Sequence, residues 1–174
     1  MAGARRGERD AFEALARTYL RAAYAVALAI LGRPADAEDV AQDAMVTAFE
    51  KIDTCRDPGQ FAAWLLQIAR NQAKNWRSKR SLREKGRDVD VQDLEVPTST
   101  PQLNAQLRKN LIEALSEISQ VQREVVLLHD LEGFTHKEIG ACVGISETMS
   151  RQHLFNARRT LRVLLRELGA RSGK

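Results

Sequence analysis

The sequence predicts an all-α protein made of two small helical domains joined by a flexible linker. Apolar residues recur at three- and four-residue steps through almost every segment of the 174-residue chain, which is the period of an amphipathic helix. No segment shows the strict apolar–polar alternation that is typical of a half-buried strand. Residues 88–104 combine acidic side chains with two prolines and lack apolar periodicity, so they read as a linker. We therefore expect a first domain over residues 8–82, a linker over 83–105 and a second domain over 106–170.

Three helices are expected in the first domain. Asp10 and Glu13 resemble a capping pair at the start of the first helix, which should end at Gly32-Arg33-Pro34. Asp36 can cap the second helix, whose acids cluster near the N-terminus, where the helix dipole favours them. Asp57-Pro58 then predicts the start of the third helix. Its apolar stripe comprises Phe61, Trp64, Leu65, Ile68 and Ala69.

Order is expected to weaken from about Ser81 and to resume with the leucine stripe that begins at Leu107. Each later helix in the second domain has a recognisable capping residue at its start. Ser119, Thr135 and Ser146 are the expected caps, and the first two are followed after three residues by Gln122 and Glu138, which completes a capping box. These three caps predict that three further helices begin in this domain after the leucine-rich helix.

Composition narrows the class of protein. A hydrophobic fraction of 44% supports packed cores, and a charged fraction of 29% favours a soluble surface. The longest apolar stretch, residues 22–31, is well short of the roughly 20 residues that cross a bilayer, and no signal-peptide cleavage site follows it. We expect a cytoplasmic protein without membrane insertion.

Cofactor and metal chemistry are not expected. Cys55 and Cys142 lie in different halves without CxxC spacing, so reduced thiols are the default. The three histidines and Cys142 match no zinc-ligand spacing. The chain has no Gly-rich phosphate loop and no Ser/His/Asp order that would indicate an active site, so we expect no enzyme.

Residues 133–159 read as a helix-turn-helix, whose second helix can lie in the major groove of DNA. Ile139, Val143 and Ile145 are the expected buried residues, and Gly144 permits the turn. The inward face of the second helix should comprise Ser150, Leu154, Ala157 and Leu161. Its outward face should comprise Thr148, Arg151, Gln152 and Phe155. Arg151 and Gln152 have the donor geometry to read base edges, whereas Arg158, Arg159 and Arg162 suit phosphates.

The third helix of the first domain mixes bases with aromatic and amide side chains. Such a mixture suits single-stranded DNA, because unstacked bases can pile on aromatic rings. Trp64 is in phase with Phe61 and Ile68, so we expect it in the core; Trp76 fits either the core or a surface. Basic stretches at 70–87 and 151–171 are separated by acids at 88–95, which indicates two nucleic-acid contacts.

These motifs, in this order, resemble the extracytoplasmic-function sigma factors of the bacterial sigma-70 family. Residues 37–43 resemble the family's Ala-Glu-Asp-hydrophobic-x-Gln-Glu signature, and residues 61–71 resemble its Ala-Trp-Leu-x-x-Ile-Ala-x-Asn block. Later motifs follow the pattern of the family's last domain: Gln122–Val125, Glu138–Gly140, Gly144–Ser146 and Ala157-Arg158.

The resemblance implies a dissociable subunit of RNA polymerase that recognises the −10 and −35 promoter elements. The acidic helix would dock on the coiled coil of the largest polymerase subunit through Asp36, Glu38, Asp39, Gln42 and Asp43. The basic helix would open the −10 element and hold its displaced strand through Arg70, Asn71, Lys74, Asn75, Trp76 and Arg77. The loop over residues 51–60 would receive a flipped base. The last helix would read the −35 duplex through Thr148, Arg151, Gln152, Phe155, Asn156, Arg158 and Arg159. An anti-sigma factor is an implied partner.

The sequence also departs from the family pattern. Met149 stands where the family usually has threonine, and Asn156 stands where it often has arginine, so the promoter bases cannot be borrowed from relatives. Two other hypotheses stay open at this point. A stand-alone helix-turn-helix regulator would bind duplex DNA as a dimer, and an adaptor would use its basic faces to bind acidic proteins. The first would leave the acidic signature and the Trp64/Trp76 helix unexplained.

Overall fold

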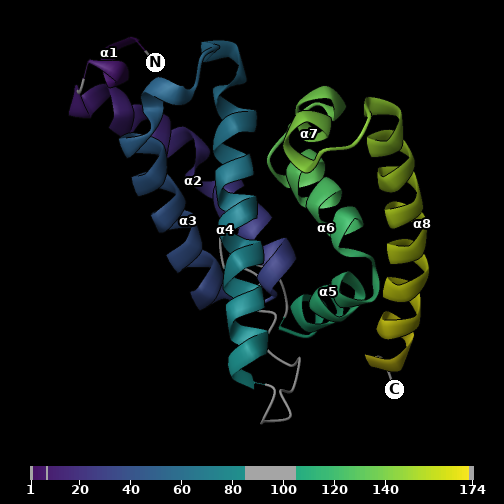
Figure 1. Ribbon diagram of the computed structural model, residues 1–174. Coiled ribbons are helices and arrows are strands. Elements are labelled where there is room, and N and C mark those ends of the chain that lie inside the picture. The colour runs from purple at the N-terminus through teal and green to yellow at the C-terminus, as the bar shows by residue number, and fades with distance from the viewer. Residues whose placement is uncertain (1, 7, 85–104, 173–174) are drawn as a thin grey trace.

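The computed structural model describes residues 2–6, 8–84 and 105–172, and all regular structure within these ranges is helical (Figure 1). The all-α prediction is confirmed. The first group of elements comprises α1 (Ala2–Arg5), α2 (Arg9–Leu31), α3 (Pro34–Glu50), the 3-10 turns η1 (Ile52–Thr54) and η2 (Pro58–Gln60), and α4 (Phe61–Glu84). The helices α2, α3 and α4 pack against each other as a three-helix bundle.

Local backbone chemistry explains where these helices begin and end. Gly32 adopts a left-handed conformation (φ 70°) after α2, and its N–H donates to the Leu28 carbonyl. This is the usual C-terminal cap, because glycine has no Cβ to oppose a positive φ. Pro34 then opens α3, where its fixed φ and missing N–H suit the first turn. Asp57 caps η2 through a 2.8 Å hydrogen bond from the Gly59 N–H, as expected, and η2 leads directly into α4.

Two of the predicted caps are wrong. The residue that precedes α2 is Glu8, without a side-chain cap, so Asp10 lies inside the first turn. The residue that precedes α3 is Arg33, because Pro34 starts that helix two residues before Asp36. Asp36 instead accepts a 2.6 Å hydrogen bond from Arg80 and ties α3 to the distal part of α4.

The second group of elements comprises α5 (Ala105–Glu117), α6 (Gln120–Val126), the π-helical turn η3 (Leu127–Leu131), α7 (His136–Val143) and α8 (Glu147–Ser172). The predicted caps are confirmed here. Ser119 and Thr135 both form complete capping boxes, and Ser146 accepts a hydrogen bond from the Met149 N–H. The helix α8 packs along α5, α6 and α7 and forms the outer edge of the molecule in Figure 1.

The two groups pack directly on each other. Figure 1 shows α6 and α7 between α4 and α8, and α4 contacts α7 while α2 contacts α6 and η3. One continuous cluster of buried apolar side chains runs through both groups, from Val26 and Leu65 to Val125 and Ile139. The predicted linker lies mostly outside the described residues, and α4 extends to Glu84, slightly beyond the expected domain boundary at residue 82.

One helix, α2, is long and apolar enough to cross a membrane by length and composition alone. Its residues from Ala22 to Ile30 are largely buried against α3, α4, α6 and η3. A core helix passes the same test of length and composition, and the packing of α2 explains its apolar character.

Candidate nucleic-acid interface

The turn between α7 and α8 has the geometry of a helix-turn-helix. Gly144 is left-handed (φ 80°), and its N–H donates to the Gly140 carbonyl at 2.9 Å. Ile139 is fully buried and Val143 is buried, while Ile145 is half-buried and packs against the same core. The prediction of burial is confirmed for Ile139 and Val143, whereas Ile145 is only half-buried. The turn fixes the direction in which α8 leaves the core.

The inward face of α8 is also as predicted. Ser150, Leu154, Ala157 and Leu161 are all buried. The one polar member, Ser150, lies 3.0 Å from His136 Nδ1 through its Oγ, so its buried hydroxyl has a partner. This face fixes the rotation of α8 about its axis.

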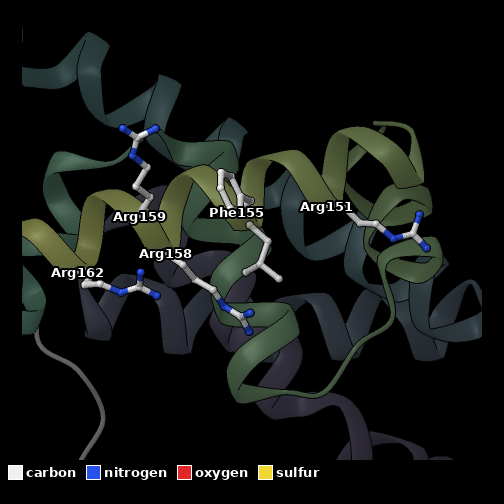
Figure 2. Close-up of a pocket in the computed structure, with 6 residues that line it drawn as sticks. Arg151, Phe155, Arg158, Arg159 and Arg162 are labelled. Atoms are coloured by element: carbon white, nitrogen blue, oxygen red, sulfur yellow. The ribbon is translucent and has the colours of Figure 1, made fainter.

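The opposite face of α8 is open to solvent and basic. All seven residues that were expected to contact DNA are exposed: Thr148, Arg151, Gln152, Phe155, Asn156, Arg158 and Arg159. Phe155 is 67% exposed, which is a large exposed fraction for an aromatic ring, and a shallow pocket forms around it. Figure 2 shows Arg159 on one edge of α8 and Arg158 and Arg162 on the other, with Phe155 on the side of Arg159 and nearer to Arg151 along the helix. Such a face can contact phosphates on both sides of a groove while an apolar ring meets base edges.

Two of these arginines already have acidic partners. Arg158 donates to Asp130 from Nε at 3.1 Å and from a terminal nitrogen at 2.5 Å. Burial raises the pKa of the Asp130 carboxyl, but hydrogen bonds from Arg158 and His129 outweigh burial, so that pKa lies below its ordinary value. The same hydrogen bond raises the pKa of Arg158. Arg151 pairs with Glu147 one turn earlier on α8. Asp130 was not predicted as part of the site, because it lies outside the helix-turn-helix motif.

Beside the ion pair of Arg158 and Asp130, the rings of His129 and His136 stack with their centroids 4.6 Å apart. His129 Nδ1 lies 2.8 Å from Asp130 Oδ1. The pKa of His136 is lowered, mainly by burial and secondly by the charge of His129. Within the described ranges, no three His, Cys, Asp or Glu side chains gather as a metal site would require.

The basic helix α4 does not present its six predicted DNA contacts on one open face. Asn71, Asn75 and Trp76 are exposed, and Lys74 is half-buried. Arg70 is half-buried, and its Nε donates to Glu124 of the second group of helices at 2.7 Å. Arg77 is exposed and donates to Gln120 of the same group at 2.7 Å.

The two tryptophans of α4 lie in different environments. Trp64 packs against the core and lies 5.7 Å from Phe61 between ring centroids, so the expectation of a core residue is confirmed. Trp76 is 36% exposed at the surface of α4. A surface tryptophan beside Asn75 and Lys79 has the properties of a stacking platform.

The acidic helix α3 carries four of its five predicted contacts at the surface: Glu38, Asp39, Gln42 and Asp43 are exposed. Asp36, the fifth, is partly covered by Arg80. The same surface includes Val46, which is 58% exposed and follows Gln42 and Asp43 at helical spacing. Val46 was not predicted as part of this surface. Its position could have been inferred from the sequence, because it is an apolar residue at helical spacing from the acidic residues.

Comparisons with known proteins agree with this arrangement. Residues 15–83 match the family model for sigma-70 region 2, and residues 108–161 match the model for sigma-70 region 4. The chain is 31% identical over 170 residues to the RNA polymerase sigma factor CarQ of Myxococcus xanthus, with 94% of each chain covered. It is 29% identical to the ECF RNA polymerase sigma factor SigL of Mycobacterium tuberculosis, with 97% of each chain covered.

Two further likenesses complete the comparison. A probable RNA polymerase sigma factor, RfaY of Xanthomonas campestris, is 32% identical over 146 residues; the match covers 79% of this chain but 36% of that protein. Among solved structures, the sigma factor RpoE of Bartonella quintana, in complex with the anti-sigma factor NepR, matches with a TM-score of 0.75 and 25% identity, over 89% of this chain and 96% of that one.

Proposed function

This chain belongs to the sigma-70 family as an extracytoplasmic-function sigma factor, and from that premise we propose how its faces divide the work of transcription initiation. A sigma factor gives RNA polymerase its promoter choice by binding the core enzyme and promoter DNA together. In our proposal α8 reads the −35 element, α4 opens and holds the −10 element, and α3 docks on the core enzyme. The domains would extend over residues 8–82 and 106–170.

The −35 role depends on the exposed face of α8. Arg151 and Gln152 are exposed near the start of this helix, where a recognition helix contacts bases. Phe155 would meet a thymine methyl group, and Arg158 and Arg159 would meet phosphates on opposite edges. The arrangement of apolar ring and flanking arginines around one shallow pocket is the observation that carries the proposal.

The −10 role depends on the aromatic and amide side chains of α4. Trp76 offers a ring on which an unstacked base can pile, an interaction worth ~1–3 kcal/mol per base. Asn71 and Asn75 are exposed on the same helix and can bind base edges. No hydrolysis is involved: captured bases offset the lost stacking, which costs on the order of a few kcal/mol for each flipped base.

The docking role depends on the exposed acids of α3. Asp39, Gln42 and Asp43 match the family's polymerase-binding motif and are all exposed. Val46 is exposed one turn after Gln42 and adds an apolar contact to this face. The partner would be the coiled coil of the largest polymerase subunit, whose basic side chains would complement the acids.

We also infer an anti-sigma partner, a cytoplasmic location and no enzymatic activity. The RpoE likeness supports the anti-sigma factor, because that structure is a sigma factor held by one. A stand-alone regulator that binds DNA as a dimer is not favoured, since it would leave the α3 acids and the Trp76 helix without a role.

Run-off transcription tests the proposal. Purified protein is added to sigma-free core polymerase with a library of promoter sequences, and transcripts are sequenced. We expect transcripts whose templates share two elements at a fixed spacing. The proposal fails if no template is transcribed while the protein alone binds palindromic duplexes tightly.

A further inference from the structure

We propose that Asp130 is a specificity-determining residue of the −35 interface, and that it acts through Arg158, which its carboxylate holds in one position and neutralises. Asp130 lies in η3, outside the helix-turn-helix, and is not among the residues proposed above to contact the −35 element. The inference deepens the proposed function and rests on it, because it takes α8 as the helix that reads this element. The restraint weakens the binding of α8 to duplexes of the wrong sequence more than its binding to the promoter.

The ion pair uses both oxygens of one carboxylate and one edge of one guanidinium group. Arg158 Nε donates to Asp130 Oδ2 at 3.1 Å, and a terminal nitrogen of Arg158 donates to Oδ1 at 2.5 Å. A pair with two parallel hydrogen bonds fixes the guanidinium in direction as well as in distance. The other terminal nitrogen takes no part in this pair, and the side chain of Arg158 is 52% exposed. Arg158 is therefore held in one orientation in which it can still meet an acceptor from solvent.

The Asp130 carboxylate is itself held from a second direction. Its Oδ1 lies 2.8 Å from His129 Nδ1, and the ring of His129 stacks on that of His136. His136 Nδ1 lies 3.0 Å from the Oγ of Ser150, on the buried face of α8. The carboxylate is thus connected to the inner face of the same helix whose outer face carries Arg158. Burial raises the pKa of Asp130, but the hydrogen bonds from Arg158 and His129 outweigh burial and lower that pKa, so the group is ionised at neutral pH.

The arginines on the outer face of α8 differ in how their charge is balanced. Arg151 pairs with Glu147, four positions earlier on the same helix, so this pair moves with α8 as a unit. Arg158 instead pairs with a residue of a different element, η3. Among the residues that the structure describes, Arg159 and Arg162 form no ion pair. The restraint from outside the helix therefore acts on Arg158 and leaves the charges of its two neighbours available to phosphates.

A fixed and neutralised arginine favours the correct duplex over others. Non-specific binding comes mainly from phosphate contacts, and each contact adds about 0.9 to the slope of log affinity against log salt concentration. Without Asp130, Arg158 would bind whichever phosphate lies nearest to its edge of α8, in any sequence and any register (Figure 2). Paired with Asp130, it offers a donor at one position, and the carboxylate repels phosphates that approach from elsewhere. Specificity is a difference of affinities, so weakening the wrong complexes increases it.

The test measures how strongly RNA polymerase that carries each variant prefers the correct upstream duplex. One duplex contains the upstream element shared by the transcribed templates of the run-off library, and the other contains the same bases in scrambled order. Fluorescence anisotropy at several salt concentrations gives both dissociation constants, whose ratio is the discrimination. We expect Asp130→Asn to tighten binding of the scrambled duplex by about threefold at low salt and to steepen its salt slope by about 0.9, as one added phosphate contact would. Binding of the correct duplex should change little, so discrimination falls by about threefold.

The matched control is Glu167→Gln, which removes one negative charge from an exposed position of α8. It should change both dissociation constants by the same factor and so keep the discrimination. Asp130→Glu retains the carboxylate and should keep most of the discrimination, whereas Asp130→Ser removes it and should behave as Asp130→Asn does. In the background of Arg158→Ala, Asp130→Asn should leave the discrimination unchanged, because Asp130 acts through Arg158.

A purely structural role of Asp130 gives the opposite result. A loosened η3 or α8 would weaken binding of both duplexes and lower the free energy of unfolding, which urea denaturation of the same variants measures. The inference is overturned if neither Asp130→Asn nor Asp130→Ser tightens binding of the scrambled duplex, or if discrimination falls equally in the Arg158→Ala background. Failure of the proposed function is a separate outcome, because the transcribed templates would then share no upstream element and the wild-type protein would show no discrimination before any substitution.

Discussion

Gly140 of α7 lies directly against the carbonyl group of Ile145 in the helix-turn-helix. A Cβ atom placed on Gly140 would be 2.7 Å from the Ile145 oxygen, and 3.6 Å from the Glu147 nitrogen. The backbone N–H of Ile145 donates to the Gly140 carbonyl at 3.1 Å, so the chain folds back on this residue. The close approach sets the angle between α7 and α8.

A branched side chain at this position should open the turn. We expect Gly140→Val to lower the free energy of unfolding by about 2 kcal/mol or more, because a backbone atom cannot move aside as a flexible side chain can. Urea denaturation followed by circular dichroism measures the change. Gly169→Val is the control, since Gly169 is also helical but has no neighbouring heavy atom within 4 Å. Equal stability of the two variants would contradict the packing described for the turn.

Features that depend on residues close together in the chain were easier to predict from the sequence than contacts between distant residues. The caps at Ser119, Thr135 and Ser146 depend on residues three positions apart, and all were predicted correctly. The predicted cap at Asp36 was wrong although its signal was also local. The helix α3 begins at Pro34 instead, and the Asp36 carboxylate accepts a hydrogen bond from Arg80.

The contact between the two helical groups could not be predicted. Arg70 and Glu124 are 54 positions apart in the chain, and each lies within a motif that already has a conventional explanation. Nothing in either motif indicates which partner a buried charge selects. The exposed face of α8, in contrast, follows from helical period alone once its buried face is known.

Charge reversal on α3 should weaken polymerase binding. The double substitution Asp39→Lys and Asp43→Lys places bases where the proposed docking surface is acidic, and both positions are exposed, so folding should be retained. We expect at least about a tenfold loss of core affinity, since like charges brought together at an interface cost several kcal/mol. A pull-down or fluorescence titration with core polymerase measures it.

The control for this prediction is Asp10→Lys, which reverses one charge in the same way at an exposed position of α2. Single-stranded DNA binding by the isolated protein should be similar for the reversed and control proteins. Unchanged core affinity in the double variant would refute the assignment of α3 as the docking helix.

Replacement of Arg151 and replacement of Arg159 should have different effects on promoter recognition. Arg151→Ala should cost ~1–3 kcal/mol at one base position of the upstream element, whereas Arg159→Ala should weaken all sequences alike and reduce the salt dependence. Binding to a library of duplexes at several salt concentrations separates the two patterns. Arg166→Ala, an exposed arginine further along α8, is the control. A uniform loss for Arg151→Ala would identify it as a phosphate contact.

Acidification should destabilise the protein through His136. Burial, together with the positive charges of His129, Arg151 and Arg158, lowers the pKa of His136 below 6.5, and Glu147 opposes this only in part. The unfolded chain therefore takes up the proton first as the pH falls, and the free energy of unfolding decreases from about pH 6.5 downward until the folded protein is also protonated. Replacing His136 by Gln removes the group, so urea midpoints measured between pH 7.5 and 5 should fall less steeply than in the wild type. His153→Gln, which removes a histidine outside the stacked pair, should keep the steeper wild-type slope, and identical slopes in all three proteins would exclude His136 as the source.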